Sequence, residues 1–374
     1  MLTQIIEAEN ELENLLPKNR LDASPSSALL NAALKWSGLI WTEALRLGPA
    51  QLSEDQQQQG FNLIQHPVFI CGVHRSGTTL VQNLLDGHPQ LLVLPSEGTF
   101  YTNLELKLQL QPSHNRAKYL GTEWLRRMVN PVNQPPYFLL GRSDEFGSPY
   151  VDFARCFLAW WHLLPHHEHT QWPHSAVVLA YASCTNNLAA LHWVDKTPTN
   201  ERFLNRIWQE FPRARIIQVV RNPIATLTSR KVMEPSITLR NALRFLKISY
   251  QVATDKELSD DSRFFLLRYE ELCDSPERTI AVLADFLSIA NTSHLKQAST
   301  AGISVQANSS FKKDASCGDI LKSAEHKQHD VLTAKDQKLI AAYLGNKAAL
   351  LGYQLDKPSG FSKTYTQLKH LLFR

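Results

Sequence analysis

Hydrophobic positions divide the chain into a helical beginning and a longer part in which helices alternate with short apolar runs. Apolar residues recur at helical spacing within residues 1–17 and 26–47, which predicts two helices. The polar stretch at 53–60 is expected to be a linker or loop. We therefore expect a helical N-terminal extension over residues 1–65, followed by one larger domain over residues 66–374.

Short apolar runs bounded by turn-forming or charged residues predict buried strands in the second part. The strands are expected near residue 66 and at 91–94, 191–194, 215–220 and 263–267. Helical spacing is found at 78–86, 200–210, 223–231 and 276–287, with a helix-rich stretch from about 99 to 190 and two late helices near 333–351. Strands joined by helices need crossover connections. The sequence therefore predicts an α/β fold of three layers, in which helices flank a central parallel sheet.

Composition excludes several classes of protein. Of the 374 residues, 43% are hydrophobic and 20% are charged, which is ordinary for a globular protein and excludes a mostly disordered chain. The net charge of +4 is too small to indicate a nucleic-acid partner. The five cysteines are odd in number and form no CxxC, so neither a disulfide framework nor a structural zinc site is expected. Since no apolar run approaches the roughly 18 residues of a membrane span and the N-terminus lacks signal-peptide features, we expect a cytoplasmic protein without a transmembrane segment.

The strongest chemical signal is the segment GVHRSGTT, residues 72–79, between a predicted strand and a predicted helix. Gly72 and Gly77 have the spacing of the phosphate-binding loop GxxxxGK[ST], in which backbone N–H groups and a helix N-terminus form an anion cradle. Thr78 stands in the position of the lysine that a nucleoside triphosphatase needs, and Arg75 supplies a basic residue earlier in the loop. The alternative is a Gly/Ser turn that binds nothing.

A second motif follows the apolar run at 215–220. Arg221 comes first, and Asn222-Pro223 then begins a helix with a favourable N-cap and a proline at its first position. Ser229 lies two turns later. An arginine can hold a phosphate through two hydrogen bonds, and a hydroxyl can add one more. The alternative is a capped helix with an exposed arginine.

Both segments resemble sulfotransferases of the bacterial and tyrosylprotein type, which use 3′-phosphoadenosine-5′-phosphosulfate (PAPS). HPVFICGVHRSGTTLVQNLLDGHPQL looks like their 5′-phosphosulfate-binding region, with His74 where many members have proline. VVRNPIATLTSRK looks like their 3′-phosphate motif, with Asn222 in place of a common aspartate. The resemblance covers about residues 66–353. It implies a P-loop-containing fold, PAPS as donor, adenosine 3′,5′-bisphosphate as product, and no metal.

The resemblance also implies which residues hold the donor. Arg75, Gly77, Thr78 and Thr79 would contact the 5′-phosphosulfate. The segment ANSSFKKD resembles a late serine-containing segment that covers the donor, although a plain polar loop is the alternative. The complete candidate set for donor binding is His74, Arg75, Ser76, Gly77, Thr78, Thr79, Arg221, Ser229, Ser309 and Ser310.

Sulfuryl transfer needs positive charge where the leaving phosphate gains negative charge. Lys196, in the segment DKTP, matches a lysine that related enzymes place near the leaving phosphate, and Arg75 would add positive potential. The alternative for Lys196 is an ordinary surface lysine.

The acceptor must lose a proton, which calls for a base. Glu97 is the candidate because it follows a predicted strand, and ligands gather beyond the carboxyl ends of parallel strands. Related enzymes carry a glutamate after the pair that is His88-Pro89 here. We expect partial burial and anionic donor oxygens to raise the pKa of Glu97. The alternatives are a glutamate at a helix N-terminus, or a histidine base at His88, His114 or His192.

The expected function is that of a PAPS-dependent sulfotransferase acting on a hydroxyl or amine of a small-molecule, lipid or carbohydrate acceptor. A P-loop small-molecule kinase is disfavoured by Thr78 and by the lack of a clear Walker B aspartate. A non-catalytic nucleotide-binding module is disfavoured by the presence of Arg75, Lys196 and Glu97. The segment HHEH at 166–169 fits a solvated loop better than a metal site. The sequence leaves assembly into a homo-oligomer open.

Overall fold

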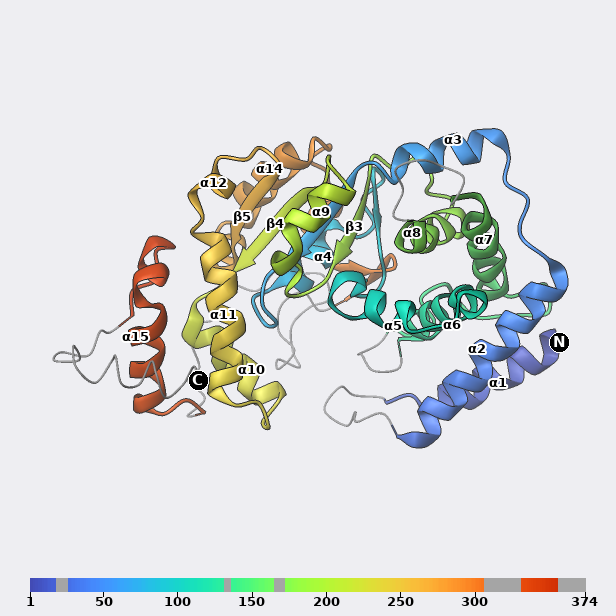
Figure 1. Ribbon diagram of the computed structural model, residues 1–374, viewed down its shortest axis with the longest axis horizontal. Coiled ribbons are helices and arrows are strands. Elements are labelled where there is room, and N and C mark those ends of the chain that lie inside the picture. The colour runs from blue at the N-terminus through green and yellow to red at the C-terminus, as the bar shows by residue number, and fades with distance from the viewer. Residues whose placement is uncertain (18–25, 131–135, 165–171, 306–330, 356–374) are drawn as a thin grey trace.

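Five parallel strands form the sheet at the centre of the structure (Figure 1). The computed structural model describes residues 1–17, 26–130, 136–164, 172–305 and 331–355. The strands are β1 (Pro67–Cys71), β2 (Leu91–Val93), β3 (His192–Lys196), β4 (Arg215–Val220) and β5 (Phe264–Arg268), arranged in the order β2-β3-β1-β4-β5. The five predicted strands and their parallel pairing are therefore confirmed.

The central strand β1 is buried along its whole length, as a strand covered on both faces must be. It pairs with β3 on one side and β4 on the other, so that Ile70 lies opposite both Lys196 and Ile217. Because the three strands run in the same direction, the segments that follow them leave the sheet at one edge. This register brings the loop at 72–79 and the ends of β3 and β4 together.

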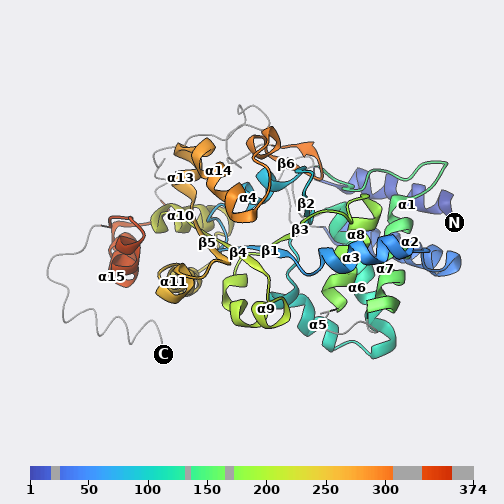
Figure 2. The ribbon, with the colours of Figure 1, turned by 90° about the horizontal axis from the view of Figure 1, so that it is seen from above.

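Helices cover both faces of the sheet, which confirms the predicted three layers (Figure 2). On one face, α4 (Thr78–Leu85), α13 (Tyr269–Asp274) and α14 (Pro276–Leu287) pack against side chains such as Val68, Ile70 and Ile217. On the other face lie α9 (Leu204–Glu210) and α11 (Leu239–Ala253). Successive side chains of each strand point to opposite faces, so one apolar strand supplies both cores.

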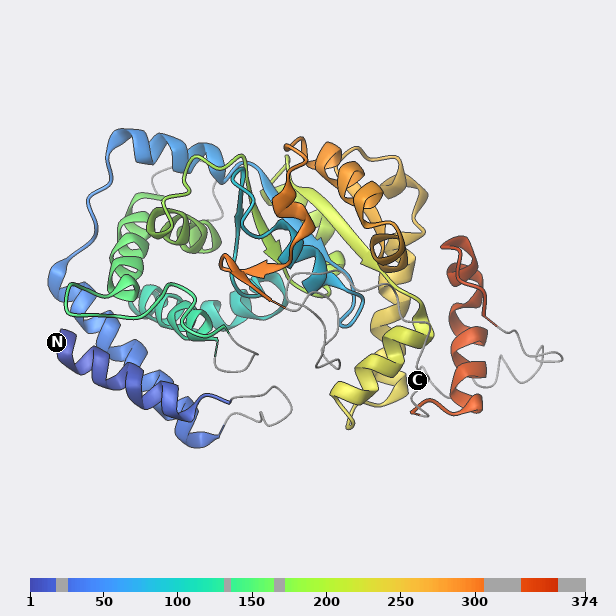
Figure 3. The same ribbon diagram turned by 180° about the vertical axis from the view of Figure 1, so that it is seen from behind.

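A second group of helices lies beyond β2 at one end of the molecule (Figure 3). It contains α1 (Leu2–Leu15), α2 (Ser27–Leu47), α3 (Glu54–Leu63), α6 (Arg116–Val129), α7 (Pro149–Leu163) and α8 (Trp172–Cys184). One continuous hydrophobic cluster joins Trp36 of α2, Trp160 of α7 and Phe69 of the sheet. The division at residue 65 stays a prediction, and the packing ties the first 65 residues to helices that lie between β2 and β3 in the sequence.

The remaining elements are short or lie near the C-terminus. They are η2 (a π-helix, Phe100–Leu104), α5 (Glu105–Gln109), η3 (Ser113–Asn115), η5 (Asn200–Phe203), α10 (Pro223–Met233), α12 (Lys256–Ser259), η6 (Ser293–Lys296), β6 (Ser299–Thr300), β7 (Ile303–Ser304) and α15 (Ala334–Leu350). The late region thus forms one helix, α15, instead of the two that the spacing predicted.

The polar stretch at 53–60 is a helix, α3, so the predicted linker was wrong. Its start is a capping box, in which the Ser53 side chain accepts from the backbone N–H of Gln56 and the Gln56 side chain accepts from Ser53. Gly60 lies against Trp160, where an added Cβ would come within 2.5 Å of Cη2. Apolar residues at helical spacing did not mark this helix, because only a narrow face of it, with Gly60 and Leu63, is buried.

The buried carboxylate of Glu9 allows a test of whether the first helices are integral to the fold. Glu9 has no exposed surface and accepts hydrogen bonds from Trp36 Nε1, Ser143 and Arg142. Glu9→Ala would leave Trp36 Nε1 and the backbone N–H of Ser143 without an acceptor, while Arg142 keeps other partners, and we expect it to lower the free energy of unfolding by about 2–5 kcal/mol. Glu13, which also pairs with Arg142 but is 63% exposed, is the matched control. Glu13→Ala should cost at most about 1 kcal/mol in urea denaturation; equal losses would contradict an integral role.

Candidate active site

The loop at 72–79 depends on its two glycines. Gly72 has a φ of 136° and Gly77 a φ of 106°, both in the region that other residues rarely adopt. A Cβ at Gly72 would lie 2.3 Å from the carbonyl oxygen of Val219, and one at Gly77 would lie 2.3 Å from Cδ2 of Tyr269. The glycines therefore let the loop pass directly against β4 and the start of α13.

The loop presents polar groups to an anion. Gly77 is the N-cap of α4 and supplies no side-chain cap, so the first N–H groups of the helix stay available to a ligand. Ser76 is 1% exposed, and its hydroxyl has no hydrogen-bond partner among the residues that the structure describes. Thr78 is buried and Thr79 is exposed in the first turn. An uncapped helix start beside an unpartnered buried hydroxyl fits a phosphate or phosphosulfate group.

The two predicted donor motifs contact each other. Arg75 Nε donates to Ser229 Oγ at 2.9 Å, and Arg221 Nη1 donates to the carbonyl oxygen of Arg75 at 3.3 Å. The guanidinium of Arg221 also lies over the ring of Tyr269, 4.4 Å from its centre. Asn222 caps α10 as predicted, accepting from the backbone N–H groups at 224 and 225. The fold thus brings together two segments that are about 150 residues apart.

Lys196 and Glu97 form an ion pair beside this loop. Lys196 is the last residue of β3, and its Nζ lies 2.6 Å from Glu97 Oε1. Its side chain is 6% exposed, so the surface-lysine alternative is wrong, whereas the Glu97 side chain is 40% exposed. Glu97 lies in the loop between β2 and η2 and does not begin a helix. The pair therefore joins an enclosed cation to a carboxylate that reaches solvent.

The pKa of Glu97 is shifted in the direction opposite to the one expected. Burial acts to raise it, but the nearby ammonium of Lys196, its hydrogen bond and the charge of Arg127 outweigh burial and lower it. Without a bound ligand, Glu97 is therefore ionised at neutral pH. Burial and donor charge alone would raise the pKa of Glu97, and the direct contact with a buried lysine reverses that direction.

His74 lies within electrostatic reach of the same pair. Loss of hydration around its ring, together with Arg230 and Lys196, lowers its pKa to about 4, although Glu97 acts in the opposite direction. Its imidazole is therefore neutral near pH 7. A neutral imidazole can both accept and donate a hydrogen bond.

Two of the three alternative histidine bases have structural partners. His88 Nε2 lies 2.9 Å from the carbonyl oxygen of Ala290, and His192 lies between the carbonyl oxygens of His66 and Leu287. His114 is exposed in η3. None of these contacts involves Lys196, which favours Glu97 over His88 and His192 as the group beside the lysine.

Arg127 is a site residue that the sequence analysis missed. From α6 it donates to the carbonyl oxygens of Glu97 and Gly98 and, at 2.9 Å, to Oγ1 of Thr99. It therefore holds three consecutive residues of the loop that carries Glu97. No local signal marks an arginine on a helix 30 residues downstream as a partner of this loop.

Two buried carboxyl groups near Lys196 were also missed. Asp195 has no exposed surface, and burial raises its pKa to about 6. Glu201 is 3% exposed, and burial raises its pKa to about 7. Asp195 begins DKTP and Glu201 follows it closely, which was the only signal, and acidic residues in a polar segment ordinarily face water.

Some predictions fall on parts of the chain that the structure does not describe. Ser309 and Ser310 lie outside the described residues, as does the segment at 166–169. Within the described ranges, no group of three or more His, Cys, Asp or Glu side chains could hold a metal ion. Among the helices described, none combines the length and the apolar character that crossing a bilayer requires.

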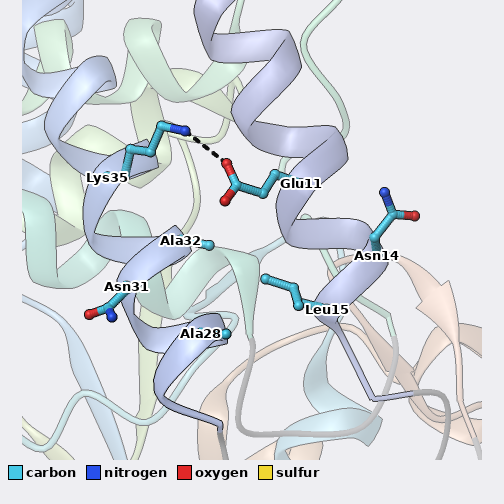
Figure 4. A pocket seen from close by; sticks show the side chains of 7 residues that line it. All are labelled: Glu11, Asn14, Leu15, Ala28, Asn31, Ala32 and Lys35. Atoms are coloured by element: carbon cyan, nitrogen blue, oxygen red, sulfur yellow. Dashed lines mark hydrogen bonds and ion pairs between the residues drawn. The ribbon is translucent and has the colours of Figure 1, made fainter.

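A hollow of 480 Å³ between α1 and α2 does not coincide with these motifs (Figure 4). Lys35 and Glu11 form an ion pair across it. Its lining consists of Glu11, Asn14, Leu15, Ala28, Asn31, Ala32 and Lys35. It brings together none of the candidate residues, so the strand ends remain the candidate active site.

Comparison with known families identifies the family of the chain. A family model described as the sulfotransferase family matches residues 67–293, more than half of the chain. The chain belongs to the sulfotransferase family. The match includes the donor loop, Glu97, Lys196, Arg221 and Ser229 of this family member. A search of curated proteins found no match.

Several solved sulfotransferases are distantly similar. The sulfotransferase domain of the Synechococcus PCC 7002 olefin synthase is 17% identical, with 83% of this chain and 94% of that domain covered and a TM-score of 0.41. A sulfotransferase from Mycobacterium avium is 15% identical, with 94% and 91% covered and a TM-score of 0.44. One from Alicyclobacillus acidocaldarius is 12% identical, with 77% and 97% covered and a TM-score of 0.38. At this distance they assign no residue roles.

Replacing Lys196 tests the cause of the low pKa of Glu97. In Lys196→Met, burial would act without the ammonium, and the pKa of Glu97 should rise above its ordinary value of about 4.3. The midpoint for ionisation, followed by carboxyl-carbon NMR, should therefore move to higher pH. Lys35→Met removes a lysine from a distant exposed pair and should leave the midpoint unchanged. An unchanged midpoint in Lys196→Met would show that another group controls Glu97.

Proposed function

We propose that the protein is a PAPS-dependent sulfotransferase that transfers a sulfuryl group to a hydroxyl or amine and releases adenosine 3′,5′-bisphosphate. The observation that carries this proposal is the juxtaposition of two linked phosphate motifs with a buried Lys196–Glu97 pair. The acceptor class proposed is a small molecule, lipid or carbohydrate. Membership of the sulfotransferase family supports the reaction type.

Donor binding is assigned to the two motifs. The N-terminus of α4, Arg75 and the Ser76 hydroxyl would hold the 5′-phosphosulfate, because they combine N–H donors with positive charge. Arg221 and Ser229 would hold the 3′-phosphate. The contacts among Arg75, Arg221 and Ser229 support one continuous site for both ends of the nucleotide.

Acceptor activation is assigned to Glu97. An acceptor oxygen or nitrogen forms a bond to sulfur while the bond from sulfur to the phosphate oxygen breaks, and Glu97 takes the acceptor proton. Lys196 and Arg75 stabilise the negative charge that the leaving phosphate gains. A carboxylate with a lowered pKa is a weak base, so the ion pair must loosen before Glu97 can accept a proton efficiently.

Lys196 provides a way to loosen the pair. An ammonium group has three N–H donors, so Lys196 can hold Glu97 and a phosphate oxygen at the same time. As negative charge develops on the phosphate, Lys196 is drawn toward it and its hold on Glu97 weakens. The pKa of Glu97 would then rise at the point in the reaction where a proton must be taken up.

Turnover in the presence of a chelator tests the reaction type. Purified protein, PAPS and a pool of candidate acceptors should give products heavier by one SO₃ in mass spectrometry, with EDTA present throughout. Activity that EDTA abolishes and Mg²⁺ restores, with ATP as donor, would favour the kinase alternative. Binding of the bisphosphate without turnover on any acceptor would favour a non-catalytic module.

Arg221→Ala tests the 3′-phosphate assignment. A hydrogen bond to a charged group contributes roughly 1.5–3 kcal/mol, so the variant should bind adenosine 3′,5′-bisphosphate about ten- to a hundredfold more weakly. Affinity for AMP, which lacks the 3′-phosphate, should change little in calorimetry. Arg278→Ala, on the exposed surface of α14, is the control. Equal losses for both nucleotides would place Arg221 elsewhere in the site.

Glu97→Gln tests the base. The amide keeps the size of the side chain but cannot take the proton, so kcat should fall roughly 10²–10⁴-fold. Affinity for the bisphosphate should hold or improve slightly, because one negative charge is lost. Glu277→Gln, a change at an 83% exposed side chain, should leave kcat unchanged. A Glu97→Gln variant with most of its activity would move the role of base to another group, His74 first.

A further inference from the structure

Each loop of the candidate site is attached through its backbone to a different buried carboxylate. Asp195 Oδ1 accepts from the N–H of Gly98 at 2.9 Å, directly after Glu97. Glu201 Oε2 accepts from the N–H of Gly72 at 3.0 Å, at the start of the donor loop. Both carboxylates lie within the DKTPTNE segment that begins at the end of β3.

The Asp195 attachment extends over two residues of the loop that carries Glu97. The Thr197 hydroxyl accepts from the N–H of Thr99 at 2.8 Å and donates to Asp195 Oδ1 at 3.1 Å. A Cβ at Gly98 would lie 2.5 Å from Asp195 Oδ1, so the loop rests directly on the carboxylate. The backbone that follows Glu97 is therefore fixed to the strand that ends in Lys196.

Glu201 holds the loop at 72–79 in a similar way, through one backbone N–H and a neighbouring hydroxyl. The Ser249 hydroxyl accepts from Gln218 Nε2 at 2.8 Å and hydrogen-bonds to Glu201. The carbonyl oxygen of Gly72 is held as well, since it accepts from the N–H of Thr199 at 3.0 Å. Both peptide groups at the entry to the donor loop are therefore attached to the segment after β3.

Burying a carboxylate is costly, and hydrogen bonds from backbone N–H groups offset part of that cost only while each loop keeps its place. Each carboxylate thus favours one position of one loop. Catalytic and binding groups need this kind of support, because errors of a few tenths of an ångström reduce function.

We infer that Asp195 and Glu201 are positioning residues with separate tasks: Asp195 holds the Glu97 loop, and Glu201 holds the donor loop. The roles given to the two loops, acceptor activation and donor binding, come from the proposed function, and to that extent the inference rests on it. The claim that the two loops are attached independently does not depend on that function, and it can be tested by itself.

Asp195→Asn and Glu201→Gln keep shape and one acceptor oxygen. Each amide oxygen can still accept from the loop N–H, but it carries no charge, so weaker neutral hydrogen bonds replace the charge-assisted ones that hold the loop. Hydrogen exchange followed by mass spectrometry needs no substrate. In Asp195→Asn, exchange in the peptide that contains Gly98 should become about tenfold faster, with the peptide over 72–80 unchanged; Glu201→Gln should give the reverse. Faster exchange in both peptides in each variant, or in neither, would overturn the inference.

The kinetic test should separate the same two tasks. Asp195→Asn should lower kcat about tenfold or more, with affinity for adenosine 3′,5′-bisphosphate within about twofold of the native protein. Glu201→Gln should weaken bisphosphate binding by about tenfold. Thr197→Val should reproduce Asp195→Asn, and Thr197→Ser should restore the rate, because it keeps the hydroxyl.

Ser37→Ala, which removes a buried hydroxyl from α2, controls for loss of stability alone. If the native protein binds no bisphosphate and transfers no sulfuryl group, the proposed function fails while the exchange experiment still decides the inference. If the native protein is active but both carboxylate variants change kcat and affinity together, the separation of tasks is wrong.

Discussion

Lys196 places its ammonium group at the end of a fully buried strand, where only 6% of its side chain is exposed. A charge in that position needs a partner, because protein atoms replace most of its hydration. Glu97 supplies the partner at 2.6 Å, and the other groups of the site are arranged around this pair. Arg127 holds the backbone of Glu97, Asp195 and Thr197 hold the residues after it, and His74 of the loop at 72–79 interacts electrostatically with both members of the pair.

The parallel sheet explains why this pair can serve transfer chemistry. β1 leads into the glycine-containing loop at 72–79, β3 ends in Lys196, and β4 is followed by Arg221. Because these strands are neighbours in the sheet, the loop at 72–79, Lys196 and Arg221 meet at one edge, as the proposed roles in donor binding and charge stabilisation require. Glu97 completes the set from the end of β2, two positions away from β1 in the strand order.

The ion pair also limits the chemistry before a donor binds. Lys196 keeps Glu97 ionised but weakly basic, so the two groups restrain each other in the free protein. Under the proposed function, a donor phosphate competes for Lys196 and releases Glu97 for proton uptake. Charge on the donor phosphate and activation of the base would then be linked through one nitrogen atom, Nζ of Lys196.

Local patterns in the sequence were enough to predict the five strands, the parallel fold, the glycine loop and the helix start at Asn222-Pro223. Apolar runs mark strands that are buried on both faces, and a glycine-rich loop or an Asn-Pro helix start can be recognised within a few residues. The helix α3 was nevertheless missed, because its sequence marks a helix by the capping box at Ser53 and lacks apolar residues at helical spacing.

Only the tertiary structure decided the surroundings of the chemical groups. That Lys196 is enclosed, that the pKa of Glu97 is lowered, and that Arg127, Asp195 and Glu201 support the two loops all depend on contacts between distant segments. Electrostatic shifts and backbone attachments are set by distances of about 3 Å. Local sequence patterns do not contain those distances, because they arise only when the strands pair and the helices pack.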